Sequence, residues 1–146
     1  AYGAIEAIIY TPDDYPRRQE LIIKHKRHLD ALIKLQTKNG AWRQVIDDED
    51  SYEELTVTCM IGYALANALK MNILSNEYME ILENAWNFVD SRIEDSGIVH
   101  DSCTGTGSLS SIEDYLNRKA ENGFDNRGGS LSAWFLVDLY KLLNDL

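Results

Sequence analysis

The apolar residues of this chain recur at helical spacing, in segments of two kinds. Residues 17–36 and 77–93 carry apolar side chains on one side and charged side chains on the other. Each of these segments predicts an amphipathic helix with one solvent-facing side. Residues 59–69 and 131–143 are apolar almost all round, with few polar interruptions. A helix of that composition has to be buried on most sides, so we expect the second kind to lie inside the protein.

The two kinds of helix alternate along the chain, because the opening segment 1–10 reads as another inner helix. This order is typical of an α/α toroid, in which helical hairpins close into a ring around a central pocket. A ring of six hairpins needs more than twice this chain at ~1.5 Å of rise per residue. We therefore predict a single all-α domain over residues 1–146, a partial (α/α)6 toroid of about three helical hairpins.

Half a ring leaves apolar flanks exposed unless something covers them. A missing N-terminal barrel half, a second copy of the chain or an open right-angled bundle would each supply that cover. We therefore expect either self-association or a missing half that precedes Ala1, where the chain begins abruptly without an initiator methionine.

Several residues predict where the helices begin and end. Ser51-Tyr52-Glu53-Glu54 and Ser110-Ser111-Ile112-Glu113 each fit a capping box. Gly40, Gly97 and Gly123 follow helical segments at positions suited to left-handed caps or tight turns. Short extended pieces at 42–46 and 98–101 fit the sequence, but we expect no sheet from them.

Charge and cysteine content narrow the classes of function. The chain has 24 acidic and 14 basic residues, a formal charge of −10, which opposes the attraction on which nucleic-acid binding mostly rests. We expect no nucleic-acid and no membrane partner. Cys59 and Cys103 lack any Cys-x-x-Cys spacing and predict two reduced thiols. Without a secretory signal or an apolar stretch of ~20 residues, we expect a cytoplasmic protein.

The most informative stretch lies between Gly40 and Leu65. It gathers an indole (Trp42), a guanidinium (Arg43), an amide (Gln44) and a carboxylate (Glu54) at the start of a buried helix. Carbohydrate sites in helical toroids are commonly built in this way. Two readings stay open for Trp42, which either stacks on a sugar ring or plugs the end of the helix pair. Arg43 and Gln44 are suited to gripping hydroxyl or carboxylate groups.

A second loop repeats the arrangement more weakly. His100 stands next to Asp101, as an oriented imidazole does, and the loop Cys103-Thr104-Gly105-Thr106-Gly107 is able to present backbone amides to a carboxylate. We predict that His100, Cys103, Thr104 and Gly105 bind substrate. Glu54 joins them as a candidate, although the capping box from Ser51 gives it a local structural role as well.

The sequence favours no metal site. His25 and His28 lie three apart on a helix without a carboxylate or cysteine at ligand spacing. The acidic run Asp47-Asp48-Glu49-Asp50 is similar to a calcium loop, but Tyr52 falls where an oxygen ligand belongs and the required glycine is absent. We interpret this run as a solvated acidic turn.

The chain resembles the second half of the unsaturated rhamnogalacturonyl hydrolases, glycoside hydrolase family 105, which are relatives of the family 88 unsaturated glucuronyl hydrolases. The resemblance covers nearly the whole chain and rests on several short motifs together. These are Gly40-Ala41-Trp42-Arg43-Gln44-Val45-Ile46-Asp47-Asp48, Ser51-Tyr52, Glu54, Thr58, Met60, Tyr63-Ala64-Leu65, Ala85-Trp86, Gly97, His100-Asp101, Cys103, Gly105-Thr106 and Tyr115-Leu116-Asn117-Arg118.

The resemblance implies a bacterial enzyme that degrades pectin-derived oligosaccharides carrying a 4,5-unsaturated uronic acid. In this family an aspartic acid protonates the vinyl ether double bond and activates water to hydrate it, without a metal or an organic cofactor. That route differs from the two-carboxylate displacement of most glycosidases. The resemblance places the catalytic aspartate in the first barrel half, so we expect no catalytic residue in this chain.

The chain departs from the family pattern at two positions, Glu53 in place of an apolar residue and Leu55 in place of a threonine. We expect the chain alone to bind substrate weakly and to catalyse no measurable turnover. A second class of function stays open at this point, a non-catalytic helical scaffold that holds a protein partner along its inner helices.

Overall fold

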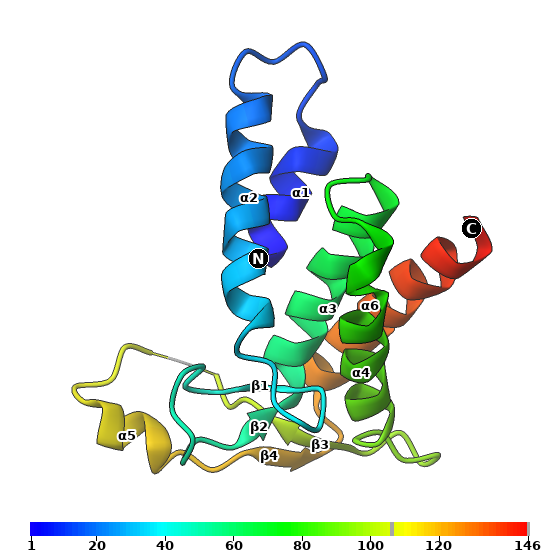
Figure 1. Ribbon diagram of the computed structural model, residues 1–146. Coiled ribbons are helices and arrows are strands. Elements are labelled where there is room, and N and C mark those ends of the chain that lie inside the picture. The colour runs from blue at the N-terminus through cyan, green and yellow to red at the C-terminus, as the bar shows by residue number, and fades with distance from the viewer. Residues whose placement is uncertain (106, 146) are drawn as a thin grey trace.

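The computed structural model describes residues 1–105 and 107–145, and most of them lie in helices (Figure 1). The helices are α1 (Tyr2–Tyr10), α2 (Arg18–Ile33), α3 (Leu55–Lys70), the 3-10 turn η1 (Asn76–Tyr78), α4 (Met79–Asp90), α5 (Ile112–Leu116) and α6 (Asn126–Asp145). The strands are β1 (Trp42–Arg43), β2 (Glu53–Glu54), β3 (Val99–Ser102) and β4 (Glu121–Gly123). In this described part of the chain, every helix is too short or too polar to span a lipid bilayer.

Helix α3 lies at the centre of the core and packs against α1, α4 and α6. Most of its residues are buried, including Cys59, Ala64 and Leu65, as its apolar sequence predicts. Gly62 allows α3 to approach α6 closely, because a Cβ at this position would lie 2.4 Å from the ring of Phe135. The indole of Trp86 on α4 meets the same ring edge-on, with 5.5 Å between the ring centroids.

Helix α6 differs from the prediction, because only one of its sides is buried. Ser132, Phe135, Leu139 and Leu142 face the core. The other side exposes large apolar side chains: Trp134, Leu136, Val137, Tyr140 and Leu143. The expectation that this helix is buried on most sides is therefore wrong within this chain.

The amphipathic helix predicted over residues 17–36 forms as α2, beside α1 at one edge of the molecule (Figure 1). Its buried side carries Leu29 and His25. The imidazole of His25 is 1% exposed, and neither ring nitrogen has a hydrogen-bond partner among the residues that the structure describes. Burial lowers the pKa of His25 to about 4, because the charged imidazolium would lose its hydration.

The four strands lie together at one end of the helices, which brings the two predicted loops to the same end (Figure 1). They form two antiparallel ladders, with Trp42 opposite Glu54 in one and Val99 opposite Gly123 in the other. The extended pieces were expected without a sheet, and the ladders correct this. The ladder partners lie between 10 and 24 residues away in sequence, too far for a local pattern to show.

The predicted left-handed glycines are confirmed, with φ of 89° at Gly40, 86° at Gly97 and 140° at Gly123. Gly40 is also tightly enclosed, because a Cβ there would lie 2.1 Å from the carbonyl oxygen of Asn84. The second predicted capping box exists one residue later than expected. Ser111 caps α5 and pairs with Asp114, not Glu113, because the helix begins at Ile112.

The buried histidine predicts a pH-dependent stability. The unfolded chain takes up a proton near pH 6.5, whereas folded His25 resists it until about pH 4, so stability is lost as the pH falls through this window. We expect His25 to account for a loss of about 2 kcal/mol between pH 7 and pH 5. His25→Leu should remove that loss in urea unfolding measured at both pH values.

The matched control is His28→Leu, which changes an exposed imidazole three residues along the same helix. This variant should keep most of the pH dependence. Equal pH dependence in the parent chain and in His25→Leu would contradict the assignment.

Candidate functional site

An open pocket of about 350 Å³ lies where the start of α3 meets the segment after β3 and the first turns of α6. It brings together five of the predicted site residues: Gln44, Glu54, Cys103, Thr104 and Gly105. The remaining lining residues are Thr56, Val57, Met60, Tyr115, Arg127 and Leu131. The loop after Gly40 and the loop after Gly97 thus contribute to a single hollow.

Glu54, which lines this pocket, connects the two loops. Its carboxylate is 2% exposed and accepts hydrogen bonds from the backbone amides of Thr56 (2.6 Å) and Val57 (2.6 Å) at the start of α3. The same carboxylate accepts from the backbone amide of Cys103 at 2.8 Å. It also accepts from the Thr56 hydroxyl at 2.7 Å. One carboxyl group therefore joins the β1–β2 ladder, helix α3 and the loop after β3.

The cap of α3 differs from the predicted capping box. Glu54 is itself the N-cap residue, and the Ser51 hydroxyl accepts instead from the backbone amide of Val45 at 2.8 Å. The prediction failed because it placed the helix start near Ser51, whereas the chain is still extended through β2. Burial raises the pKa of the Glu54 carboxyl, and the hydrogen bonds from Thr56, Val57 and Cys103 oppose that rise.

Gln44 carries an unsatisfied group next to the pocket. Its side-chain oxygen is buried and accepts no hydrogen bond from any described residue, 1–105 and 107–145. A buried acceptor without a donor is unfavourable by about 1–3 kcal/mol. Gln44 lines the pocket, so a ligand hydroxyl that reaches this oxygen would relieve the penalty.

Two arginines border the Thr104–Gly105 segment. Arg118 donates through Nη2 to the Thr104 hydroxyl at 2.5 Å and to the Gly105 carbonyl at 2.7 Å, which fixes this loop. Arg127 also lies close to this segment, since a Cβ on Gly105 would be 3.3 Å from its Nη1. Arg127 pairs with Asp125 at 2.7 Å, and this contact raises the pKa of Arg127 further.

Sequence reasoning missed Arg127 as a lining residue. It stands in Asn126-Arg127-Gly128-Gly129, which has neither the lysine nor the spacing of a phosphate loop and so gave no signal of binding. Arg118 lies within the family motif Tyr115-Leu116-Asn117-Arg118, so the sequence did indicate that this residue is important.

In the structure, Trp42 packs at the end of the helices, which is the structural one of the two roles left open by the sequence. The indole is fully buried, and its N–H donates to the Leu32 carbonyl at 2.7 Å at the end of α2. Its face is closed to a sugar by the core. The backbone amide of Trp42 donates to the Thr58 hydroxyl at 3.0 Å, which attaches β1 to α3.

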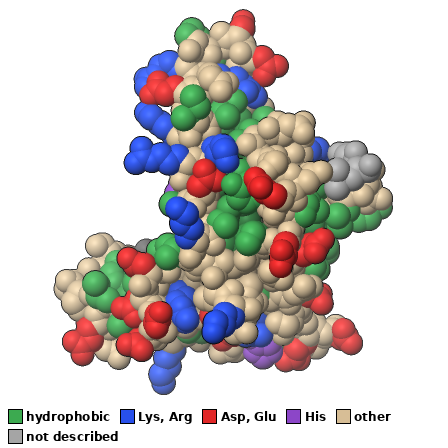
Figure 2. All heavy atoms as spheres, in the orientation of Figure 1, with side chains coloured by type: hydrophobic (Ala, Val, Ile, Leu, Met, Phe, Trp, Pro, Cys, Tyr) green, Lys and Arg blue, Asp and Glu red, His purple; other side chains and the backbone are tan. Residues whose placement is uncertain are grey.

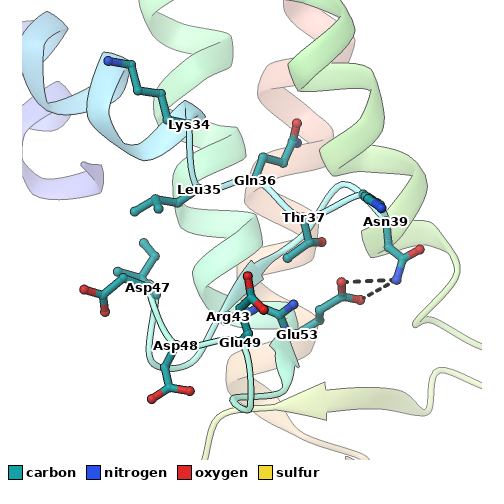
Figure 3. A pocket seen from close by; sticks show the side chains of 12 residues that line it. Lys34, Leu35, Gln36, Thr37, Asn39, Arg43, Asp47, Asp48, Glu49 and Glu53 are labelled. Atoms are coloured by element: carbon teal, nitrogen blue, oxygen red, sulfur yellow. Dashed lines mark hydrogen bonds between the residues drawn. The ribbon is translucent and has the colours of Figure 1, made fainter.

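Arg43 lies away from the pocket, because neighbouring residues of a strand point to opposite faces. It donates to the Ser51 carbonyl at 2.8 Å and lines a second hollow of about 640 Å³ (Figure 3). That hollow mixes basic Lys34 with acidic Asp47 and Asp48, and Asn39 donates across it to Glu53 at 3.0 and 3.2 Å (Figure 3).

His100 is also separated from the pocket. Its Nε2 lies 2.7 Å from a Glu94 oxygen and its Nδ1 lies 3.3 Å from the Asn122 side-chain oxygen. The hydrogen bond to Glu94 raises the pKa of His100. The structure therefore engages this imidazole with surface partners and not with the Cys103–Gly105 loop.

Within residues 1–105 and 107–145 neither cysteine forms a disulfide; Cys103 lines the pocket, and Cys59 is buried in the core. Burial raises the pKa of Cys59 to about 12, so this thiol is unreactive. Among residues 1–105 and 107–145, no cluster of three His, Cys, Asp or Glu side chains is placed to hold a metal ion.

The sequence of residues 1–143 matches the model of one protein family, Glycosyl Hydrolase Family 88. The chain belongs to this family. Its similarity to the unsaturated rhamnogalacturonyl hydrolases is confirmed as well. The chain is 29% identical over 115 residues to the unsaturated rhamnogalacturonyl hydrolase YesR of Bacillus subtilis, covering 77% of this chain and 31% of that protein.

A second relative is also named as a hydrolase of an unsaturated sugar. The unsaturated 3S-rhamnoglycuronyl hydrolase of an Alteromonas species is 27% identical over 103 residues, covering 68% of this chain and 25% of that protein. The family 88 chain thus spans about a third or less of the length of these curated relatives.

The fold prediction is confirmed by solved structures. A "possible member of GH105 family" from Salmonella enterica superposes with a TM-score of 0.86 at 20% identity, over 99% of this chain and 38% of that one. At this identity the likeness shows the fold alone. The family 88 chain is a partial α/α toroid, with the strands and the pocket at one end of its helices.

The four hydrogen bonds to Glu54 predict a large loss of stability when this residue changes. Glu54→Ala should lower the free energy of unfolding by at least about 2 kcal/mol, because it removes a helix cap and strands a buried amide of the second loop. Urea unfolding at pH 7 measures this. The neighbouring Glu53→Ala removes a carboxylate that bonds to the exposed Asn39 side chain, and should change stability by less than about 1 kcal/mol. Equal losses in the two variants would contradict the bridging role.

Proposed function

We propose that this chain is the C-terminal half of a glycoside hydrolase that acts on oligosaccharides ending in a 4,5-unsaturated uronic acid, of the kind released from pectin and rhamnogalacturonan. In this proposal residues 1–146 form one wall of the substrate pocket. The catalytic aspartate comes from the other barrel half, and no cofactor takes part.

The observation that carries the proposal is the single pocket formed by Gln44, Glu54 and the Cys103–Gly105 segment. The residues come from two loops far apart in sequence, and both loops carry family motifs. Membership of Family 88 and the name of the relative YesR support a substrate with an unsaturated uronic acid.

The chemistry of the pocket suits an acidic sugar. A uronate offers hydroxyl groups and a carboxylate, which need hydrogen-bond donors, acceptors and a positive charge. Gln44 presents an unpaired acceptor and Arg127 presents a guanidinium that carboxylates bind well. The apolar side chains of Val57, Met60 and Leu131 supply a surface for the non-polar face of a sugar ring.

Within this proposal the pocket binds and orients the sugar while the reaction takes place at the opposite wall. Hydration of the double bond gives a hemiketal, which opens and releases the next sugar. The wall described here lowers the barrier by holding the unsaturated ring in place, an effect of orientation and not of proton transfer.

A pocket variant tests the proposal in the protein expressed with the coding sequence upstream of Ala1. Loss of the ultraviolet absorbance of the conjugated double bond reports turnover of a 4,5-unsaturated disaccharide. Gln44→Ala should raise KM about tenfold, because the sugar loses a hydrogen bond in a partly dry site. Gln19→Ala changes an exposed glutamine of α2 and should leave KM unchanged.

Turnover by the upstream-extended protein with equal KM in both variants would remove Gln44 from the substrate site. No turnover of any 4,5-unsaturated disaccharide, together with capture of a protein partner by the helices, would favour the scaffold instead.

The chain 1–146 alone gives a second test. We expect it to bind the disaccharide weakly and to leave its absorbance unchanged, since the proposed proton donor lies in the other half. Sustained turnover by this chain alone would contradict that division of labour.

A further inference from the structure

The charge of this protein is distributed very unevenly. The protein as a whole is acidic, but the segment that contains helix α2 is basic. Residues 17–38 hold seven of the 14 lysines and arginines but only two of the 24 acidic residues. This segment therefore has a formal charge of +5, whereas the rest of the chain has −15. Figure 2 shows the basic side chains projecting along the outer edge of α2.

Four of these side chains form what we call the basic stripe: Lys24 and Arg27 on α2, and Arg17 and Lys34 directly before and after it. All four are exposed, and their spacing of three or seven residues keeps them within about a 100° arc of the helix. At ~1.5 Å of rise per residue the stripe is about 25 Å long. It lies on the side opposite the buried Leu29 and His25, so the core does not use it.

The stripe is only partly neutralised within the protein. Glu20 pairs with both Arg17 (3.0 Å) and Lys24 (2.6 Å), so one carboxylate is shared by two cations. Across residues 1–105 and 107–145, Arg27 and Lys34 form no ion pair. Unpaired cations spaced along an exposed helix are available to an anionic partner.

The acidic remainder of the protein does not cancel this field. Salt screens charges beyond about 8 Å at physiological ionic strength, a third of the length of the stripe. The acidic turn at Asp47, Asp48 and Glu49 faces Lys34 across the hollow of Figure 3 and marks where the positive surface ends. An extended anion would therefore follow α2 and stop short of that turn.

We propose that the basic stripe binds the acidic polysaccharide chain, as a second contact separate from the substrate pocket. The inference rests on the proposed function, because a uronic acid polymer carries one carboxylate on each sugar and so presents a line of negative charge. A line of negative charge matches a line of cations. A single small anion would not need cations arranged in a line. The stripe thereby retains acidic chains near the protein.

The test measures binding of polygalacturonate to the chain 1–146 at low salt, by fluorescence anisotropy of the labelled polymer. The variant Arg27→Glu/Lys34→Glu reverses the two unpaired cations. The matched control Lys70→Glu/Lys119→Glu makes the same change of net charge at exposed lysines away from the basic stripe. We expect the stripe variant to bind at least about tenfold more weakly and the control to bind within about twofold of the parent chain.

Two further probes distinguish a polysaccharide contact from binding of another kind. Fully methyl-esterified polygalacturonate lacks the carboxylates and should not bind, and its binding would contradict a charge-based contact. A DNA duplex at the same charge concentration should bind no better than polygalacturonate, and tighter DNA binding would assign the stripe to nucleic acid. A changed solution mass of the stripe variant, with unchanged polymer binding, would assign it to contacts between copies of the chain.

Failure of this proposal is distinguishable from failure of the proposed function. In the upstream-extended protein, Arg27→Glu/Lys34→Glu should turn over the unsaturated disaccharide with unchanged KM, because neither residue lines the substrate pocket. Equal polygalacturonate binding by the parent chain, the stripe variant and the control overturns the stripe alone. Absent disaccharide turnover by the extended parent protein overturns the enzyme assignment alone.

Discussion

One buried carboxylate determines how the functional end of this protein is assembled. Glu54 lies at the end of the β1–β2 ladder and accepts hydrogen bonds from the first free amides of α3, where the helix dipole favours a negative charge. It also accepts the Cys103 amide of a loop 49 residues away. Burying a carboxylate is unfavourable unless its oxygens are well hydrogen-bonded, so this group stays in place only while both loops surround it.

The packing of the helices positions the residues that surround this carboxylate. Because Gly62 has no side chain, α6 packs closely on α3 through Phe135, and the first turns of α6 then reach the pocket beside the second loop. Trp42 closes the end of α2 over the same core, and its backbone joins Thr58 on α3. The pocket therefore lies where α3 and α6 begin, beside the loop after β3. The outer side of α6 leaves large apolar side chains exposed in this chain.

Periodicity predicted the helices well, since α2 and α4 form where one-sided apolar patterns occur and α3 where polar residues are missing. The glycines at 40 and 97 indicated the turns, because a left-handed conformation favours glycine. Side-chain direction was harder to predict. Which face Arg43 and Gln44 take depends on a two-residue strand and its partner far along the chain. Trp42 was undecidable from sequence, because an indole suits a core and a sugar equally.

The site was predicted in part for a similar reason. Family motifs indicated Gln44 and the Cys103–Gly105 segment, which the pocket unites, but they also indicated His100, which bonds to Glu94 on the surface. The cap at Glu54 depends on where α3 begins, and that start is fixed by tertiary pairing. Arg127 reaches the pocket only through the packing of α6, which no local pattern encodes.

The bridging role of Glu54 is tested most directly by a pH titration of the ¹⁵N-labelled chain, followed by nuclear magnetic resonance. Because one carboxyl group receives all three backbone hydrogen bonds, the amide resonances of Thr56, Val57 and Cys103 should shift together with a single midpoint, raised above the ordinary pKa of a glutamate by burial. A Cys103 amide that shifts with a different midpoint, or does not shift, would contradict the joining of the two loops.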